Sequence, residues 1–282
     1  MKIYSLVAKR IEDGGWTGVC RFDQMLRRVF SELQSITPAL LPGAFAPDDV
    51  VIADNHLSLL VPDSVKTIVV HHGCAEVHYE RDPHWRTDST RAIVEQQRAM
   101  FEKPNRKYVA PSQWAADQFW PKLKFICIQV IPHWVDPLPR AQSMNERPVI
   151  IGDWRDWNKG SGIWRELADR CPQWKFRPLS FRNDTEKKEQ YKAASLFLSL
   201  SLCEGAGYAM ADAEAAKLPI VTTDTGLFQE LSECAIIPWQ KRNDLQLIEC
   251  AIENRLRTPR VLSFYERYSF GDWAGLWRKA IQ

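Results

Sequence analysis

Short runs of β-branched and other apolar residues alternate with helical periodicity along the whole chain. Nearly uninterrupted apolar runs, such as 49–53 and 67–70, are typical of parallel strands that are covered on both faces. Between such runs, apolar residues recur at helical spacing, for example from Phe22 to Leu33. This alternation predicts βαβ units and therefore an α/β fold with parallel sheets. The other expected strands are 3–7, 107–110, 125–131, 149–151, 175–177, 196–198, 219–222 and 235–237, and the other expected helices are 163–170, 208–216 and one that Ser112 caps.

A proline-rich stretch divides the chain near its middle. The segment from Pro132 to Pro148 also contains Pro137 and Pro139 and has little periodicity, so it is the best candidate for a linker. The length of 282 residues allows two domains of about 140 residues each. We therefore expect two Rossmann-like, doubly wound domains that face each other across a central cleft, 1–135 and 136–262. In such folds ligands bind at the carboxyl ends of the strands.

Composition excludes several classes of protein. There are 37 Lys and Arg against 35 Asp and Glu, a net charge of +2, so nothing indicates a nucleic-acid binder. The seven cysteines are scattered without a C-x-x-C pair, which favours reduced thiols over a disulfide framework or a zinc site. No run approaches the ~20 apolar residues of a membrane helix, and the first apolar run is too short for a signal peptide. We expect a cytoplasmic protein.

The most informative segment is the strand, turn and helix from Ser201 to Tyr208. A carboxylate, Glu204, follows the expected strand, and Gly205, Ala206 and Gly207 lead into the expected helix. Free N–H groups at a helix N-terminus attract phosphate groups. Asp212 follows Glu204 by two helical turns, and carboxylates accept hydrogen bonds from sugar hydroxyls. This pattern predicts a nucleotide-sugar site; a Gly-rich turn with two solvated acids is the alternative.

The second half resembles the retaining GT-B glycosyltransferases of family GT4 (glycosyl transferases group 1). The resemblance lies in Tyr191 to Gly207, Asp212, Pro219 to Thr222, Gly226 and Glu230, and it needs no gap between Glu204 and Pro219. Two further stretches are similar to family motifs: Val109 to Trp114 with Ile131 to Asp136, and Gly152 with Lys159 and Gly160. The resemblance implies a GT-B fold. It also implies that a helix within 263–282 packs back on the N-terminal domain.

The resemblance also implies roles for single residues of the second half. Lys159, helped by Arg155, would hold the donor diphosphate, because cations stabilise the charge that develops on a leaving pyrophosphate. Glu204 would contact hydroxyls of the donor sugar, and the N–H groups of Gly205, Ala206 and Gly207 would contact the sugar and phosphate. Asp212 would replace the glutamate that binds the ribose.

In the first half, the resemblance places Gly14 and Gly15 in a loop beside the phosphates and His72 in the cleft. Such enzymes need no metal and no cofactor besides the nucleotide-diphosphate sugar, which is a co-substrate. The acceptor would be a glycan, a lipid-linked molecule or another hydroxyl compound. A lipid-linked acceptor leaves open a peripheral contact with the inner face of the membrane, and the oligomeric state stays open.

The chain departs from the family pattern at three positions that bear on function. Asp212 is one methylene shorter than glutamate, Asp153 stands where the family has arginine, and Trp134 stands where the hinge motif has glycine. There are two alternatives to a retaining glycosyltransferase, and Asp153 and Asp212 motivate the first of them. One is a non-catalytic, glycosyltransferase-like protein that binds a glycan or nucleotide. The other is a nucleotide-sugar epimerase of GT-B fold.

The segment 73–87 is a further candidate on the acceptor side. Its histidines match no compact zinc signature, so we predict no metal there. We expect a mobile loop in which Tyr79 and Trp85, with the preceding His71, contact the acceptor; an ordinary surface loop is the alternative. Outside this segment, the expected roles are shielding of the phosphate loop by Trp154 and Trp157 and anchoring of a final helix in the core by Trp273 and Trp277.

Overall fold

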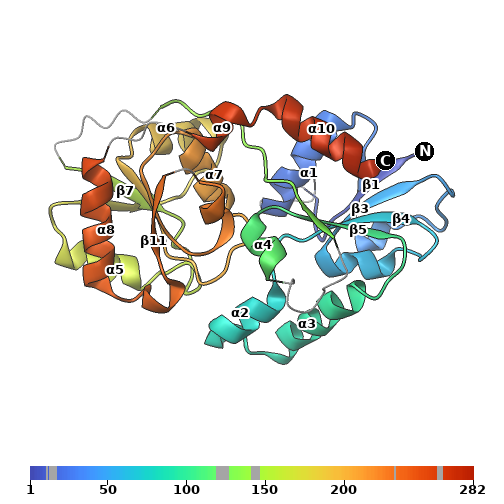
Figure 1. Cartoon of the computed structure of the whole chain (residues 1–282), viewed down its shortest axis with the longest axis horizontal. Helices are drawn as coiled ribbons and strands as arrows, with labels where there is room; N and C mark the ends of the chain where they lie inside the picture. The colour runs from blue at the N-terminus through green and yellow to red at the C-terminus, as the bar shows by residue number, and fades with distance from the viewer. Residues whose placement is uncertain (11, 13–17, 119–126, 141–146, 232, 259–262) are drawn as a thin grey trace. The chain divides into compact units, whose positions relative to one another are not determined.

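The computed structural model describes residues 1–282 except 11, 13–17, 119–126, 141–146, 232 and 259–262. It divides into two compact units, each with its own parallel sheet (Figure 1). The first unit comprises Met1–Trp134 together with Phe270–Gln282, and the second comprises Val135–Ser269. The boundary expected from the sequence lies between residues 135 and 136, and the two units divide between Trp134 and Val135. The predicted Gly14 and Gly15 lie outside the described residues.

The sheet of the first unit has six strands in the order β2-β1-β3-β4-β5-β6, and each neighbouring pair is parallel. The strands are β1 (Ile3–Leu6), β2 (Gln34–Ile36), β3 (Val50–Asp54), β4 (Lys66–Val70), β5 (Arg106–Ala110) and β6 (Ile128–Val130). Ile52 of β3 pairs with Ile68 of β4, and both side chains are buried. Covering of both faces explains why these strands have nearly continuous apolar sequences.

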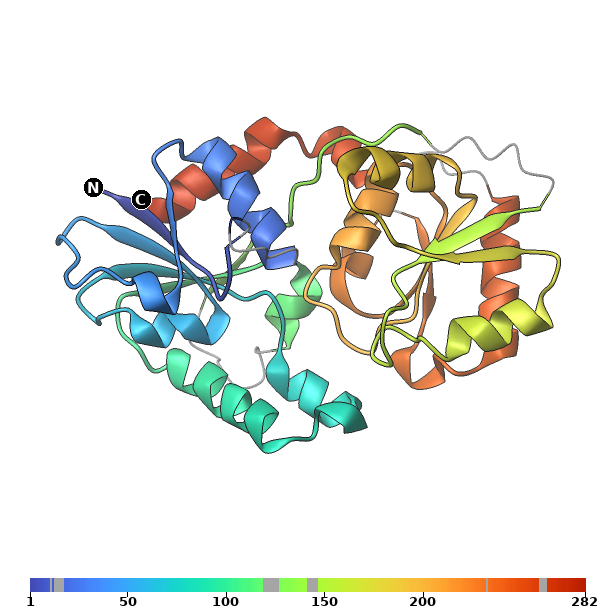
Figure 2. The same cartoon turned by 180° about the vertical axis from the view of Figure 1, so that it is seen from behind.

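Helices cover both faces of this sheet (Figures 1 and 2). On one face lie α1 (Gly18–Val29) and α10 (Phe270–Ile281), and on the other lie η2 (Asn55–Leu60), α2 (Ala75–Arg81) and α3 (Asp88–Met100). Trp273 and Trp277 of α10 are fully buried, and the ring of Phe22 lies 5.3 Å from that of Trp277. The prediction that these tryptophans anchor a final helix is confirmed. The remaining elements of this unit are η1 (Pro38–Leu40), η3 (Pro83–Trp85) and α4 (Gln113–Asp117), the last capped by Ser112 as predicted.

The prediction of a loop at 73–87 was wrong, because α2 and η3 occupy it. The N-terminus of α2 is capped by Gln97 of α3. The amide of Ala75 donates to Gln97 Oε1 at 2.8 Å, and Gln97 Nε2 donates to the carbonyl of Gly73 at 3.0 Å. A cap that comes from 22 residues downstream leaves no signal in the local sequence.

Replacing Gln97 with alanine is expected to lower the free energy of unfolding by about 1–2 kcal/mol, because a buried amide and a carbonyl lose their partner. Urea unfolding measures the loss, and hydrogen exchange should locate it in α2. Gln96, which is exposed on the same helix, provides the matched control. Equal stabilities for the two alanine variants would contradict the capping role.

The sheet of the second unit has five parallel strands in the order β11-β10-β9-β7-β8. They are β7 (Val149–Gly152), β8 (Lys175–Pro178), β9 (Leu196–Ser199), β10 (Ile220–Thr223) and β11 (Cys234–Ile237). Each matches an expected strand within one residue at either end. The agreement follows from burial, since the central strands β7, β9 and β10 have no exposed residue.

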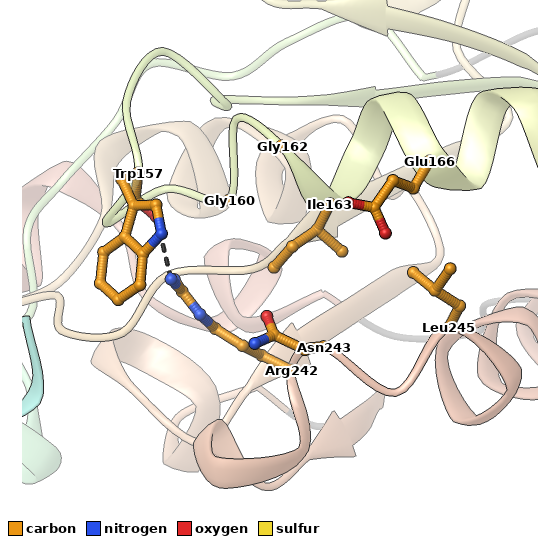
Figure 3. A pocket seen from close by; sticks show the side chains of 8 residues that line it. All are labelled: Trp157, Gly160, Gly162, Ile163, Glu166, Arg242, Asn243 and Leu245. Carbon is orange, nitrogen blue, oxygen red and sulfur yellow. Dashed lines mark hydrogen bonds between the residues drawn. The ribbon is translucent and has the colours of Figure 1, made fainter.

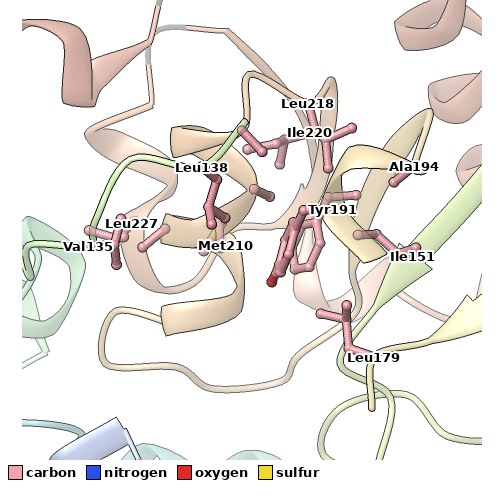
Figure 4. Packing of buried hydrophobic residues seen from close by; sticks show 14 of the residues in the cluster. Val135, Leu138, Ile151, Leu179, Tyr191, Ala194, Met210, Leu218, Ile220 and Leu227 are labelled. Atoms are coloured by element: carbon pink, nitrogen blue, oxygen red, sulfur yellow. The ribbon is translucent and has the colours of Figure 1, made fainter. Parts of the chain in front are cut away.

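Two helical layers cover this sheet. One face carries α5 (Ile163–Arg170) and α8 (Leu245–Arg257), and the other carries α6 (Asp184–Lys192), α7 (Tyr208–Ala215) and α9 (Phe264–Arg267). Figure 4 shows the core on the α6 and α7 side, where Tyr191 and Met210 pack with Ile151 and Ile220. The hydroxyl of Tyr191 donates to the carbonyl of Ala209 at 3.0 Å and so joins α6 to α7. The short helices η4 (Gly226–Gln229) and η5 (Trp239–Lys241) complete the unit.

Candidate functional site

The candidate site begins with the loop that follows β7 and leads to α5. The Asp156 side chain accepts a hydrogen bond from the amide of Lys159 at 3.0 Å, which closes a tight turn. Gly160 has φ +85°, and a Cβ there would lie 2.7 Å from Leu200 Cβ. Only glycine therefore lets the loop pass this close to the end of β9. The turn holds Lys159 at the carboxyl end of the sheet.

The second part of the site is the segment from Ser201 to Gly207 at the carboxyl end of β9. Gly207 has φ +81° and begins α7, whose Met210 and Ala211 amides donate to its carbonyl at 3.0 Å. Gly226 lies against this segment, because a Cβ there would come within 2.8 Å of the Ala206 carbonyl oxygen. The Glu204 loop is thus supported from β10 as well as from β9.

Four charged side chains meet where these two segments lie together. The ammonium of Lys159 pairs with Glu204 Oε1 and lies 3.9 Å from Asp153 Oδ2. The guanidinium of Arg155 donates to both oxygens of Asp153, at 2.6 and 2.9 Å. The structure therefore brings the predicted Arg155, Lys159 and Glu204 into one network. The side chains of Lys159 and Glu204 are each 16% exposed, so both remain accessible to a ligand.

Burial lowers the pKa of Lys159, while Asp153 opposes that shift. Partial desolvation strengthens the electrostatic interactions of this ammonium, but an anion must displace the carboxylates that already pair with it. The hydroxyl of Ser201 donates to Glu204 Oε1 at 3.2 Å and orients this carboxylate. The site thus offers cations for an anionic group beside a carboxylate for hydroxyl groups.

Asp212 lies in a different environment from Glu204. It is only 1% exposed within α7, and its Oδ1 is 3.8 Å from the ammonium of Lys187 on α6. Lys187 also lies 3.4 Å from Asp184 Oδ1. The carboxylate of Asp212 therefore helps to join α6 to α7. The role of Asp212 in binding a ribose stays a prediction.

Trp154 is a core residue, so the expectation that it shields the phosphate loop was wrong. Its indole is buried, donates to the carbonyl of Leu198 at 3.1 Å and stacks on Trp164 with ring centroids 5.4 Å apart. Trp157, by contrast, is 39% exposed.

Sequence reasoning missed Arg242, which holds the two segments together. Its guanidinium is buried, and Nη1 donates to the carbonyls of Asn158 at 2.8 Å and Leu200 at 3.0 Å. Nη2 donates to the carbonyl of Trp157 at 3.0 Å. Arg242 is 84 residues from Asn158 in sequence, so no local motif could have found it. It fixes the loop of Lys159 against the end of β9.

In the first unit, His72 follows β4 and lies in an aromatic cluster with Phe22 and His133. The centroid of the His72 ring is 4.9 Å from that of Phe22 and 5.3 Å from that of His133. Burial lowers the pKa of His72 to about 3 and also lowers the pKa values of His71 and His133. His72 is therefore a neutral imidazole at physiological pH.

The carboxyl end of β3 adds polar groups that sequence reasoning did not select. Within the described residues, Asp54 Oδ1, Asn55 Oδ1 and His56 Nδ1 are buried without a hydrogen-bond partner. Burial raises the pKa of Asp54 to about 7. Buried polar atoms without partners are rare in folded proteins, and an ordered water, an ion or a ligand is what usually satisfies them. The signal that could have found them is three polar residues directly after a buried apolar run.

The other predicted acceptor-side residues, Tyr79 and Trp85, lie on α2 and η3. Trp85 stacks on His78, with ring centroids 4.5 Å apart, and the hydroxyl of Tyr79 accepts from Arg91 at 3.3 Å.

Among the described residues, no group of histidine, cysteine or acidic side chains is arranged to hold a metal ion. In the same part of the chain, no helix combines the length and hydropathy needed to cross a membrane.

Lowering the pH is expected to destabilise the protein through His72. Its folded-state pKa of about 3 lies below the ordinary value of 6.5, so the unfolded state takes up the proton first. Protonation of His72 does not affect the free energy of unfolding above pH 6.5. This free energy is lower by about 2 kcal/mol at about pH 5, because there the unfolded state holds the proton and the folded state does not. Urea unfolding across this range measures the slope.

The variant His72→Gln isolates this effect. Asp54 acts in the opposite direction between its ordinary value of 3.8 and about 7, and it contributes equally to both proteins. The variant should therefore lose less stability than the wild type as the pH falls, while a glutamine in place of the exposed His84 serves as control. Parallel pH profiles for wild type and His72→Gln would show that this imidazole is not held neutral.

Known protein structures share this fold. The chain is similar to a sucrose-phosphate synthase from Thermosynechococcus elongatus, with 12% identity, a TM-score of 0.70 and 99% of each chain covered. It is 14% identical to WaaG, a glycosyltransferase involved in lipopolysaccharide biosynthesis, with a TM-score of 0.63 and 99% of this chain and 95% of WaaG covered. With TarM the identity is 13%, the TM-score 0.58 and the coverage 84% of this chain but only 55% of TarM.

No protein-family model matches the sequence, and no curated protein matches it. At these identities the structural likeness shows the fold alone. Two parallel sheets covered by helices, together with a likeness that covers 99% of the chain, define a GT-B fold. The predicted α/β fold class with two Rossmann-like domains is therefore confirmed. The chain spans about half the length of TarM.

Proposed function

We propose that this chain is a glycosyltransferase that moves a sugar from a nucleotide-diphosphate donor to an acceptor hydroxyl with retention of configuration. The observation that carries the proposal is the pairing of Lys159 with Glu204, at the carboxyl ends of β7 and β9. Ligands of doubly wound folds bind at this edge. One accessible cation and one accessible carboxylate fit a diphosphate joined to a sugar.

In this proposal, Lys159 and Arg155 hold the diphosphate and Glu204 binds hydroxyls of the donor sugar. The amides of Gly205, Ala206 and Gly207 add donors at the start of α7, and Asp212 binds the ribose. The bond from the anomeric carbon to the diphosphate breaks while the acceptor oxygen bonds to that carbon. The acceptor proton passes to the departing phosphate oxygen, so neither a metal nor an enzymic nucleophile takes part.

The first unit would bind the acceptor. His72 with His71 follows β4, and Tyr79 and Trp85 lie on the adjoining α2 and η3. WaaG has a role in lipopolysaccharide synthesis. The acceptor in this proposal is the hydroxyl group of a glycan or of a lipid-linked molecule. The enzyme would act in the cytoplasm, at the inner face of the membrane, and the product would be a polysaccharide or another glycoconjugate.

A titration with nucleotides tests the proposal. Calorimetry with UDP, GDP and ADP should show saturable binding of at least one of them, and the matching nucleotide sugar should be hydrolysed slowly or transferred. An epimerase would instead convert the donor alone into an isomer. Absence of binding by all three nucleotides would overturn the proposal.

One observation favours a second candidate, a glycosyltransferase-like protein without catalysis. Arg155 is bound to Asp153, and Lys159 is bound to Glu204, so both cations already have anionic partners. A diphosphate must compete with these carboxylates. A scaffold that binds only a glycan is separated by the nucleotide titration, because it binds none of the three. A scaffold that binds a nucleotide is separated by the transfer assay, because it neither hydrolyses nor transfers the donor sugar.

A further inference from the structure

A pocket of about 290 Å³ opens in the second unit, on the side of the sheet that α5 and α8 cover (Figure 3). Its walls come from the loop after β7, the first turn of α5 and the start of α8. Lys159, Glu204 and Asp212 do not line it. Its size is just below the range for drug-sized ligands, about 300–1,000 Å³, and suits a single small ring.

The indole of Trp157 forms one wall of this pocket and is 39% exposed. The guanidinium of Arg242 lies 4.4 Å from the centre of its ring. Three backbone carbonyls hold Arg242 in place, including that of Trp157 itself. The guanidinium therefore packs against one face of the indole and leaves the opposite face for a ligand. A rigid aromatic ring binds a flat apolar face with little loss of conformational freedom.

Two polar side chains line the pocket without partners among the described residues. The carboxylate of Glu166 and the amide of Asn243 are both exposed, and neither side chain forms a hydrogen bond or ion pair within that part of the chain. Figure 3 shows them on the walls formed by α5 and by the start of α8. A carboxylate accepts hydrogen bonds and an amide both donates and accepts them, which matches neighbouring hydroxyl groups.

The charges around the pocket disfavour an anionic ligand. The hydrogen bonds of Arg242 are directed at backbone carbonyls. Asp244 caps α8 by accepting from the amide of Leu247 at 3.0 Å, and Glu166 lies in the first turn of α5. Both helix N-termini therefore already have a carboxylate nearby. A ligand with an apolar face and hydroxyl groups but no charge fits these groups.

We propose that this pocket is a carbohydrate subsite that binds one neutral sugar ring of a glycan, stacked on Trp157 and hydrogen-bonded by Glu166 and Asn243. The pocket shares the loop of Trp157 to Gly160 with the proposed donor site, but Lys159, Glu204 and Asp212 do not line it, and sugar binding there does not depend on sugar transfer. A glycan held there would keep the protein on a polymer.

Titration by NMR tests the subsite. The probes are methyl α-D-glucopyranoside, methyl α-D-mannopyranoside and N-acetylglucosamine, and the signal is the indole N–H of Trp157, assigned with Trp157→Phe. At least one sugar should shift this signal in a saturable way. Glu166→Gln and Asn243→Ala should each weaken binding about threefold to tenfold, and Trp157→Ala by more than about tenfold. The first two substitutions are at exposed side chains and keep the test valid if Trp157→Ala does not fold.

Three outcomes would overturn the subsite. They are a lack of saturable shift with all three sugars, unchanged affinity in both Glu166→Gln and Asn243→Ala, and displacement of the sugar by inorganic phosphate. The variant Lys159→Ala separates this inference from the proposed function. If Lys159→Ala still binds the sugar while the wild type binds no nucleotide, the subsite is supported and the transferase is refuted. If the wild type binds a nucleotide while neither protein binds the sugar, the transferase is supported and the subsite is refuted.

Discussion

Replacing Lys159 with alanine is expected to lower the rate of sugar transfer by at least about a hundredfold. The ammonium is an accessible cation at the carboxyl end of β7 beside Arg155, and the variant leaves the charge on a departing diphosphate without this partner. The affinity for the nucleoside diphosphate should fall as well. Transfer assays and calorimetry on the same preparation measure both effects.

A matched control is available on α6, where Lys188 is exposed. Alanine at this position should leave transfer unchanged and should exclude a general effect of removing a surface charge. Glu204→Ala should also abolish transfer but should keep nucleotide affinity, because it frees Lys159 from its carboxylate partner. Near-normal turnover in either Lys159→Ala or Glu204→Ala would refute the assigned site.

Replacing Arg242 with methionine is expected to lower the free energy of unfolding of the second unit by about 3–5 kcal/mol. Methionine fills similar space but leaves the carbonyls of Trp157, Asn158 and Leu200 without their donor. Because two of these carbonyls directly precede Lys159, nucleotide affinity should fall in the molecules that remain folded. Urea unfolding and calorimetry provide the two readouts.

Arg257 on α8 is the control for this substitution, since it is 78% exposed and, among the described residues, pairs only with Glu253 one turn away. Methionine there should change stability by less than about 0.5 kcal/mol. Arg242→Lys should recover part of the stability, because an ammonium reaches fewer of the three carbonyls. An unfolding midpoint for Arg242→Met equal to that of Arg257→Met would show that the guanidinium does not join the two segments.

The strands could be predicted because parallel strands are covered on both faces, and strands that are buried on both faces have uninterrupted apolar sequences. The run 149–151 became β7, Val149–Gly152, for this reason. The edge strand β2, Gln34–Ile36, was not predicted, because only one of its three residues is buried and its sequence has no such run. Helix α2 was missed since its cap comes from another helix.

The same distinction holds for the site. Glu204 was predicted because it lies in a short segment whose glycines reveal a tight turn between a strand and a helix, whereas Lys159 was predicted from the resemblance to a family motif at Gly152, Lys159 and Gly160. Arg242 could not be predicted, because its role depends on three carbonyls from two distant segments. The different exposure of Glu204 and Asp212 was also out of reach. Spacing places both near one helix start but does not tell which carboxylate a neighbouring helix covers.

The first unit is assembled from two separated parts of the chain, Met1–Trp134 and Phe270–Gln282. During synthesis every residue of the second unit leaves the ribosome before α10 does. The apolar side of α1 around Phe22, which α10 later contacts through Trp277, therefore stays uncovered while about half of the protein is still being made. Of the two units, the one whose translation begins earlier is the one that completes its core later.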